Sequence, residues 1–265
     1  MARAVGFFTD TTVCIGCKAC EVACKQWNGL PDDGLQFTGM SYDNTVALGA
    51  STWRHVAFIE RPVALPGQKS GLGGFSWLMM SDVCKHCRRA GCLEACPTGA
   101  IVRTEFDSVY VQPDICNGCG YCVSGCPFGV IDRREDDGRA WKCTLCYDRL
   151  RDGATPACAQ ACPTESIQFG DLEELKERAD RRVAEVRAAG VATAYLYGAD
   201  AERQPGTEGL NAFFLLVDAP EVYNLPPEPA APAVTLRSAW AAAATAAGAL
   251  LVAALGAALG ARTSR

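Results

Sequence analysis

The chain has 265 residues, enough for one large domain or two modest ones, and hydrophobic and charged fractions of 49% and 21% that are ordinary for a globular protein. Its net charge of −5 argues against a general nucleic-acid binder, because such proteins present a basic face. Sixteen cysteines are unusual, and they gather in four tight groups within 14–162. Closely spaced thiols of this kind indicate metal centres rather than disulfides.

The first group has the most specific spacing. Cys14, Cys17, Cys20 and Cys24 follow the pattern C-x2-C-x2-C-x3-C. In bacterial ferredoxins this run supplies three thiolates to one [4Fe–4S] cluster and a fourth to a neighbouring cluster. Gly16 suits the tight loop, because glycine adopts backbone angles that other residues resist. Such a run needs a partner run elsewhere in the chain.

Three further runs supply partners. The second delays its third cysteine by two residues, the third repeats the first spacing, and the fourth carries a larger insertion. Each ends in Cys-Pro, where proline predicts a turn from helix to strand, so the chain contains an internal repeat. Their cysteines are Cys84, Cys87, Cys92 and Cys96; Cys116, Cys119, Cys122 and Cys126; and Cys143, Cys146, Cys158 and Cys162.

The segment 100–115 predicts how the runs pair. It holds two short β-rich pieces around an Asp-Ser turn, a hairpin of the kind that joins the halves of a two-cluster ferredoxin. The second and third runs then form one unit, the first and fourth form the other, and each unit exchanges fourth ligands. The predicted sets are Cys14, Cys17, Cys20 and Cys162 for cluster 1; Cys24, Cys143, Cys146 and Cys158 for cluster 2; Cys84, Cys87, Cys92 and Cys126 for cluster 3; and Cys96, Cys116, Cys119 and Cys122 for cluster 4.

Each cluster with its thiolates is an anion, which is costly to bury unless donors face it. Basic side chains near the runs either supply that field or are solvated surface charges; they are Lys18, Lys85, Arg88, Arg89 and Lys142. His86 exceeds the ligand count, so we expect a hydrogen-bonding or surface role. Structural zinc is the alternative for the cysteines, although zinc does not need four thiols in one short turn.

Between and after the runs, the pattern predicts strands near 51–60 and 75–80, an amphipathic helix at 171–190 that covers the second unit, and a buried strand at 211–218. A proline-rich linker follows at 225–234.

The C-terminal stretch has no charge between Ala239 and Ala261, and about 20 apolar residues are enough to span a bilayer. A Gly-x3-Gly step there suits packing against other membrane helices. We therefore expect a single transmembrane anchor at 237–262, with a buried soluble helix as the alternative because alanine makes the hydrophobicity marginal.

The sequence thus predicts an α+β fold of two ferredoxin-like 2×[4Fe–4S] units with irregular insertions and a C-terminal transmembrane helix. The predicted segments are 1–24 and 140–170 for the first unit, 25–83 for an insertion, 84–139 for the second unit, 171–236 for an extension of helix, strand and linker, and 237–262 for the anchor.

Several stretches resemble the four-cluster β subunits of membrane-bound molybdenum or tungsten oxidoreductases, above all the iron–sulfur β subunits of respiratory formate dehydrogenase of the N type. The stretches are 14–28, 116–128, 141–149, 182–186, 195–198 and 221–226. The resemblance implies a non-catalytic electron-transfer subunit. Electrons from formate, oxidised in an α subunit with a pterin-bound metal, would enter at cluster 1, pass through clusters 2 and 3, and leave from cluster 4 to a cytochrome b subunit that reduces quinone.

The resemblance also implies a hetero-oligomer at the cytoplasmic membrane, with the cluster domain on the periplasmic face after export with a partner. No signal peptide fits before Cys14. Arg262 and Arg265 beyond the anchor, against Arg237 before it, favour a C-terminus inside. The alternatives are the equivalent subunit of a nitrate, polysulfide or thiosulfate enzyme and, from another class, a zinc-stabilised structural protein.

Overall fold

The computed structural model describes residues 4–32, 34, 45, 47–61 and 76–263. Its largest sheet has the strand order β8-β1-β10-β9 and joins segments far apart in the chain. Strand β1 (Val5–Asp10) is parallel to β10 (Ala212–Leu216) and antiparallel to β8 (Ile167–Asp171), and β9 (Tyr195–Tyr197) pairs with β10. Every residue of β1 and β10 is buried, as expected for strands covered on both faces.

The two faces of β1 belong to two different cores. Phe8 stacks on Phe213 at 5.5 Å between ring centroids, in the core that includes the apolar residues of the long helix. Phe7, on the opposite face, packs in a second core that includes Cys20, Cys24 and Cys158. Successive side chains of a strand point to opposite faces, so this one strand links the sheet to the cysteine loops.

That long helix is α6 (Leu172–Ala188), which confirms the helix predicted at 171–190. The Asp171 side chain caps it by accepting hydrogen bonds from the N–H groups of Glu173 and Glu174. The apolar face of α6 packs on β1, β8 and β9. The expectation that α6 covers the second unit is therefore wrong, because β9 and β10 extend the sheet that contains β1 and this sheet needs a cover.

The predicted helix–Cys-Pro–strand repeat is confirmed at all three places. Helix α2 (Gly91–Glu94) precedes β4 (Ile101–Arg103), α3 (Tyr121–Gly125) precedes β6 (Asp132–Arg133), and α5 (Ala157–Gln160) precedes β8.

The hairpin predicted at 100–115 is confirmed, and the strands predicted near 51–60 and 75–80 pair to form a second hairpin. Strand β4 pairs with β5 (Val109–Val111), and β2 (Arg54–Arg61) pairs with β3 (Ser76–Val83), each antiparallel. The Gly-rich stretch 67–74 between β2 and β3, which the sequence predicts to be a turn, lies outside the described residues. A short pair of β6 with β7 (Ala140–Trp141) closes the second unit.

The segment predicted to be an extended linker, 225–234, is packed against the body of the protein. Leu225 and Ala231 are buried. A 3-10 turn, η2 (Pro232–Thr235), then meets α2: a Cβ at Gly91 would lie 2.8 Å from the Pro232 Cδ. The C-terminal helix therefore starts from a defined place beside the second unit.

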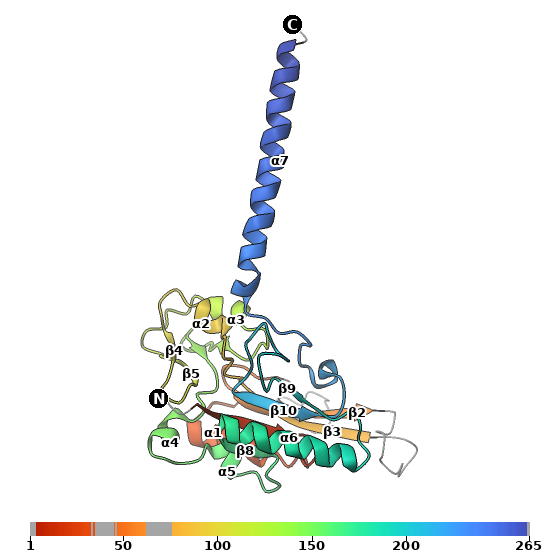
Figure 1. Cartoon of the computed structure of the whole chain (residues 1–265). Coiled ribbons are helices and arrows are strands. Elements are labelled where there is room, and N and C mark those ends of the chain that lie inside the picture. The colour runs from red at the N-terminus through yellow and green to blue at the C-terminus, as the bar shows by residue number, and fades with distance from the viewer. Residues whose placement is uncertain (1–3, 33, 35–44, 46, 62–75, 264–265) are drawn as a thin grey trace.

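Helix α7 (Leu236–Thr263) leads away from the rest of the chain, with α2 and α3 beside its first turn and α1 (Ala19–Asn28), α4 (Tyr147–Arg151) and α5 at the far end of the molecule (Figure 1). Trp240, Leu250 and Val252 on it are exposed. Within the part of the chain that is described, no helix combines the length and the apolar character needed to cross a membrane. The transmembrane helix expected at 237–262 is therefore not confirmed.

Candidate metal centres

The cysteines of three predicted sets each line one cavity. The three cavities have about 290, 320 and 290 Å³ of empty space. The four cysteines around each are Cys14, Cys17, Cys20 and Cys162; Cys84, Cys87, Cys92 and Cys126; and Cys96, Cys116, Cys119 and Cys122. Each cavity thus draws thiols from two runs that are separate in the sequence.

The loop around the first cavity shows how backbone conformation turns the thiols inward. Gly16 has φ +67°, and a Cβ there would lie 2.6 Å from the Phe58 ring and 2.7 Å from the Met79 sulfur. Glycine is thus required both for the left-handed turn and for the close approach of the β2–β3 hairpin, as the motif predicted for the turn. Helix α1 then starts and presents Cys20, whose Sγ is 3.2 Å from the Ser81 Oγ.

The remaining set, set 2 with the cysteines predicted for cluster 2, lies between α1 and α5, which pack against each other. Cys24 is on α1 and Cys158 on α5, and all four members of the set are buried. Burial raises the pKa of the Cys24 thiol far above its usual value, and the charges of Cys143, Cys158 and Cys146 raise it further. These four thiols therefore form one electrostatic group.

Most of the buried thiols resist ionisation in the absence of a positive partner. Burial, the largest cause in each case, raises the pKa of Cys20 to about 11, that of Cys92 to about 12 and that of Cys122 to about 11. Thiolates are the metal-binding form, so a metal centre has to supply the charge that offsets their desolvation. Cys96 differs: burial raises its pKa, but hydrogen bonds from Thr98 and from backbone N–H groups together outweigh burial and lower it.

Two buried nitrogen atoms close to the cysteines have no hydrogen-bond partner among the described residues. Arg54 is fully buried, and its Nη2 donates to the Cys158 Sγ at 3.2 Å, while its Nε is unpaired. His86 lines the second cavity; its Nδ1 accepts from the Val109 N–H at 3.1 Å, and its Nε2 is unpaired. Buried donors of this kind need hydrogen-bond acceptors, and the sulfur atoms of an iron–sulfur cluster can accept these hydrogen bonds.

Arg54 was not singled out from the sequence. A signal was nevertheless present, because Arg54 is two residues before Val56 and therefore on the same face of β2, and Val56 is buried. A charged residue in phase with the apolar face of a predicted strand is a reason to expect a buried charge with a buried counter-charge.

Comparison with known proteins agrees with these sites. Two family models, both described as a 4Fe-4S dicluster domain, match residues 13–100 and 75–172, a span that contains all sixteen cysteines. A formate dehydrogenase iron-sulfur subunit from Haemophilus influenzae is 42% identical over 225 residues, which are 83% of this chain and 68% of that one. The chain belongs to the family of formate dehydrogenase iron–sulfur subunits. It is an electron-transfer subunit, and it carries four [4Fe–4S] clusters.

Two further relatives of this iron–sulfur subunit show the breadth of the family. The iron-sulfur subunit of the nitrate-inducible formate dehydrogenase of Escherichia coli is 40% identical over 224 residues, 83% of this chain and 71% of the relative. A subunit of the anaerobic dimethyl sulfoxide reductase of the same species is 32% identical over 178 residues, 67% of this chain and 78% of the relative.

The family matches, which are 4Fe-4S dicluster domains, decide against the zinc alternative. Among the residues that are described, no three His, Cys, Asp or Glu side chains lie close enough together to hold a single metal ion. A structural zinc ion needs four ligands around one centre, whereas the thiolates of an iron–sulfur cluster bind different iron atoms and stand wider apart. Cysteines spread around a cavity match the second arrangement.

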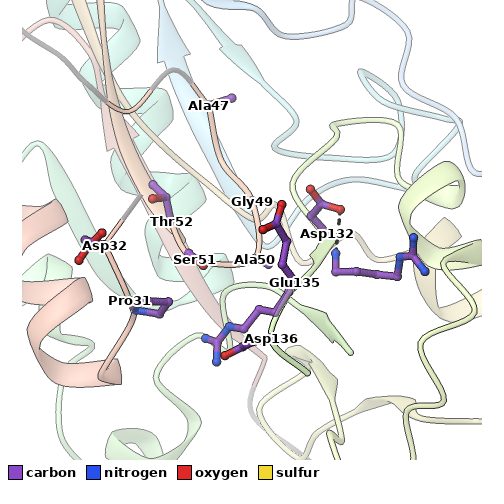
Figure 2. A pocket seen from close by; sticks show the side chains of 12 residues that line it. Pro31, Asp32, Ala47, Gly49, Ala50, Ser51, Thr52, Asp132, Glu135 and Asp136 are labelled. Atoms are coloured by element: carbon purple, nitrogen blue, oxygen red, sulfur yellow. Dashed lines mark hydrogen bonds between the residues drawn. The ribbon is translucent and has the colours of Figure 1, made fainter. Parts of the chain in front are cut away.

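Another cavity, with about 1030 Å³ of empty space, has no cysteine among the described residues of its lining. Figure 2 shows carboxylates from two segments around it, Asp32 on one side and Asp132, Glu135 and Asp136 on the other. It borders the segment 33–46, most of which lies outside the described residues. Iron–sulfur clusters are held by cysteine thiolates, so the residues described around this cavity do not form a cluster site.

Proposed function

We propose that this subunit carries electrons one at a time from a formate-oxidising catalytic subunit with a molybdenum- or tungsten-pterin to a cytochrome b subunit that reduces quinone. The relatives favour formate as the source, since several are formate dehydrogenase iron-sulfur subunits. We also propose the four ligand sets as stated from the sequence, and the division of the chain into two intertwined two-cluster units.

The proposed electron path is supported mainly by the spatial order of the four cysteine sets. Besides burial, the charge of Cys158 raises the pKa of Cys20, which supports sets 1 and 2 as neighbours. In the same way Cys84 acts on Cys143, and Cys122 acts on Cys92. These pairs connect set 1 to set 2, set 2 to set 3 and set 3 to set 4. A linear row of four one-electron carriers is what transport through a protein requires.

The exposure of the thiols agrees with an electron path whose first and last sets are accessible to partner proteins. Cys17 in set 1 and Cys119 in set 4 are exposed, whereas every cysteine of set 2 is buried. Exposed apolar side chains stand beside both: Ile15 next to Cys17, and Tyr121 next to Cys119. Apolar groups around a surface carrier suit a partner protein that excludes water from the contact.

The C-terminal helix favours one assignment of the entry and exit ends of the path. Because η2 packs on α2, α7 starts beside the second unit, which contains sets 3 and 4. We propose that α7 attaches the subunit to the cytochrome b partner at the membrane, so that electrons leave from set 4 and enter at set 1. The absence of charge between 239 and 261 and the small residues there favour packing against membrane helices. The arginines beyond this stretch favour the periplasmic face for the cluster units.

The test is purification of the affinity-tagged chain from its native host, without air, together with whatever binds it. We expect two partner subunits, and bleaching of the iron–sulfur absorption when formate is added. Reduction of a quinone analogue should follow. Bleaching by dithionite but not by formate would reject formate as the electron source, and assays with nitrate, polysulfide and thiosulfate would then identify the enzyme.

A further inference from the structure

The described part of the chain contains three lysine or arginine side chains that are almost completely buried, Arg54, Lys85 and Lys142. A buried charge needs a counter-charge. Lys85 has one, because its Nζ lies 2.5 Å from the Asp82 Oδ1. Within the described residues, Arg54 and Lys142 form no ion pair with a carboxylate. Something other than an acidic side chain has to compensate these two charges.

Arg54 lies between the first two cysteine sets. Its Nη2 donates to the Cys158 Sγ in set 2, and its Nη1 donates to the Ser81 carbonyl oxygen at 3.2 Å. The Ser81 hydroxyl in turn lies 3.2 Å from the Cys20 Sγ in set 1. Burial lowers the pKa of the guanidinium, but Cys158, Cys20 and Cys143 outweigh burial and raise it. Arg54 therefore keeps its charge and faces thiols of both sets.

Lys142 has the same position between the second and third sets. Its Nζ donates to the Cys143 carbonyl oxygen at 3.0 Å and to that of Val109, and the side chain lines the cavity of set 3. Burial lowers the pKa of Lys142, but Cys84 and Cys92 of set 3 and Cys143 of set 2 outweigh burial and raise it. Set 2 is thus flanked on each side by one cation that has no carboxylate partner among the described residues.

Burial also opposes the addition of an electron to set 2. All four of its thiols are buried, and reduction adds a negative charge to a site that is already anionic. Without a compensating field, the second carrier would hold an electron less well than its partly exposed neighbour in set 1. Transfer along the row would then be uphill at that step.

We propose that Arg54 and Lys142 are charge-compensating residues that raise the reduction potential of cluster 2, Arg54 on the side of cluster 1 and Lys142 on the side of cluster 3. Both act on the cluster through their positive charge. One electron moves between neighbouring sites and no bond forms or breaks. The inference rests on the proposed ligand sets and on the proposed electron path, but its readout is a potential and does not depend on formate.

The experiment is a redox titration with dithionite of the intact complex, followed by electron paramagnetic resonance. Arg54→Gln should move the oxidised-to-reduced equilibrium of cluster 2 at least tenfold toward the oxidised form, about 59 mV for a one-electron couple. Lys142→Gln should shift clusters 2 and 3 in the same direction. Arg54→Lys keeps the charge and should stay within about threefold of the wild type. Arg151→Gln is the matched control, because Arg151 follows Cys146 closely but is exposed, so solvent screens its charge.

Iron content separates the possible outcomes. About sixteen iron atoms per chain with unchanged potentials in Arg54→Gln and Lys142→Gln would overturn the inference. If Arg54→Gln loses a cluster, the potentials of Arg54→Lys and Lys142→Gln are used to test the inference instead. A tenfold shift in an iron-complete Arg54→Lys would show that Arg54 acts through its shape, which also overturns the inference. Failure of formate to reduce a wild-type complex with normal potentials would count against the proposed function alone.

Discussion

Sets 2 and 4 each consist of four cysteines, but the surroundings of the two sets are opposite. In set 2 every thiol is buried and Arg54 touches one of them, whereas in set 4 Cys119 is exposed and Cys96 and Cys116 are partly exposed. The comparison shows that cysteine spacing decides which cofactor is bound, while the surroundings decide its role. A carrier in the interior has to be matched to its neighbours in potential, and a carrier at the surface has to be reachable by a partner.

The largest difference between sets 2 and 4 is expected when one thiol is removed from either of them. Cys143→Ser should remove cluster 2 and also unfold the packing of α1 against α5, because Cys143, Cys24 and Cys158 belong to one core. Cys119→Ser should remove only cluster 4, with loss of about four of sixteen iron atoms. Iron analysis and electron paramagnetic resonance of both variants measure this difference. Loss of all four signals in Cys119→Ser would contradict independent sites.

A smaller effect is expected from the loop of set 4. Gly118 has φ +73°, and a Cβ there would lie 2.4 Å from the Gly138 carbonyl oxygen. Gly118→Ala should therefore destabilise the protein by about 2 to 3 kcal/mol and weaken cluster 4. Gly99→Ala is the matched control: its φ is similar at +70°, but its Cβ would meet nothing within 4 Å, so about 1 kcal/mol is expected. Urea unfolding measures the loss of stability in both variants. Equal losses would show that the left-handed backbone angle causes the destabilisation, and that the close approach of the Gly138 carbonyl oxygen does not.

A water-soluble chelator should remove iron from the clusters in the order in which their thiols are exposed. Sets 1 and 4 each have an exposed thiol, and set 2 has none. We expect the signals of clusters 1 and 4 to decay first and that of cluster 2 last, because the chelator has to reach the iron before it can bind it. Signal decay over time in the chelator measures the order. Simultaneous decay would mean that iron leaves only after global unfolding.

The smallest effect on the clusters themselves is expected from the surface of set 4. Tyr121 is 62% exposed and begins α3. Tyr121→Ala should leave iron content and potentials unchanged, while the rate of electron transfer to the cytochrome partner falls. Val22→Ala, an exposed apolar change on α1, should not affect that step. Quinone-analogue reduction under single turnover separates the two variants.

Much of the local structure could be predicted. The β4–β5 hairpin, the β2 and β3 strands, α6 and β10 were all expected from periodicity and turn residues, and Gly16 from the tightness of its loop. The strand β1 was missed, since six mostly apolar or small residues carry no pattern of their own and become a strand only by pairing with β8 and β10. That pairing also explains why α6 covers the first unit and not the second.

By itself, the sequence determined the chemistry of this protein, because thiol spacing within a turn sets which atoms can reach one cluster and needs no distant contact. The tertiary structure alone decided the electrostatics of the electron path. Arg54, Ser81 and Cys158 lie on three separate segments, and the charge of Arg54 matters only because folding removes it from water and leaves the thiols beside it.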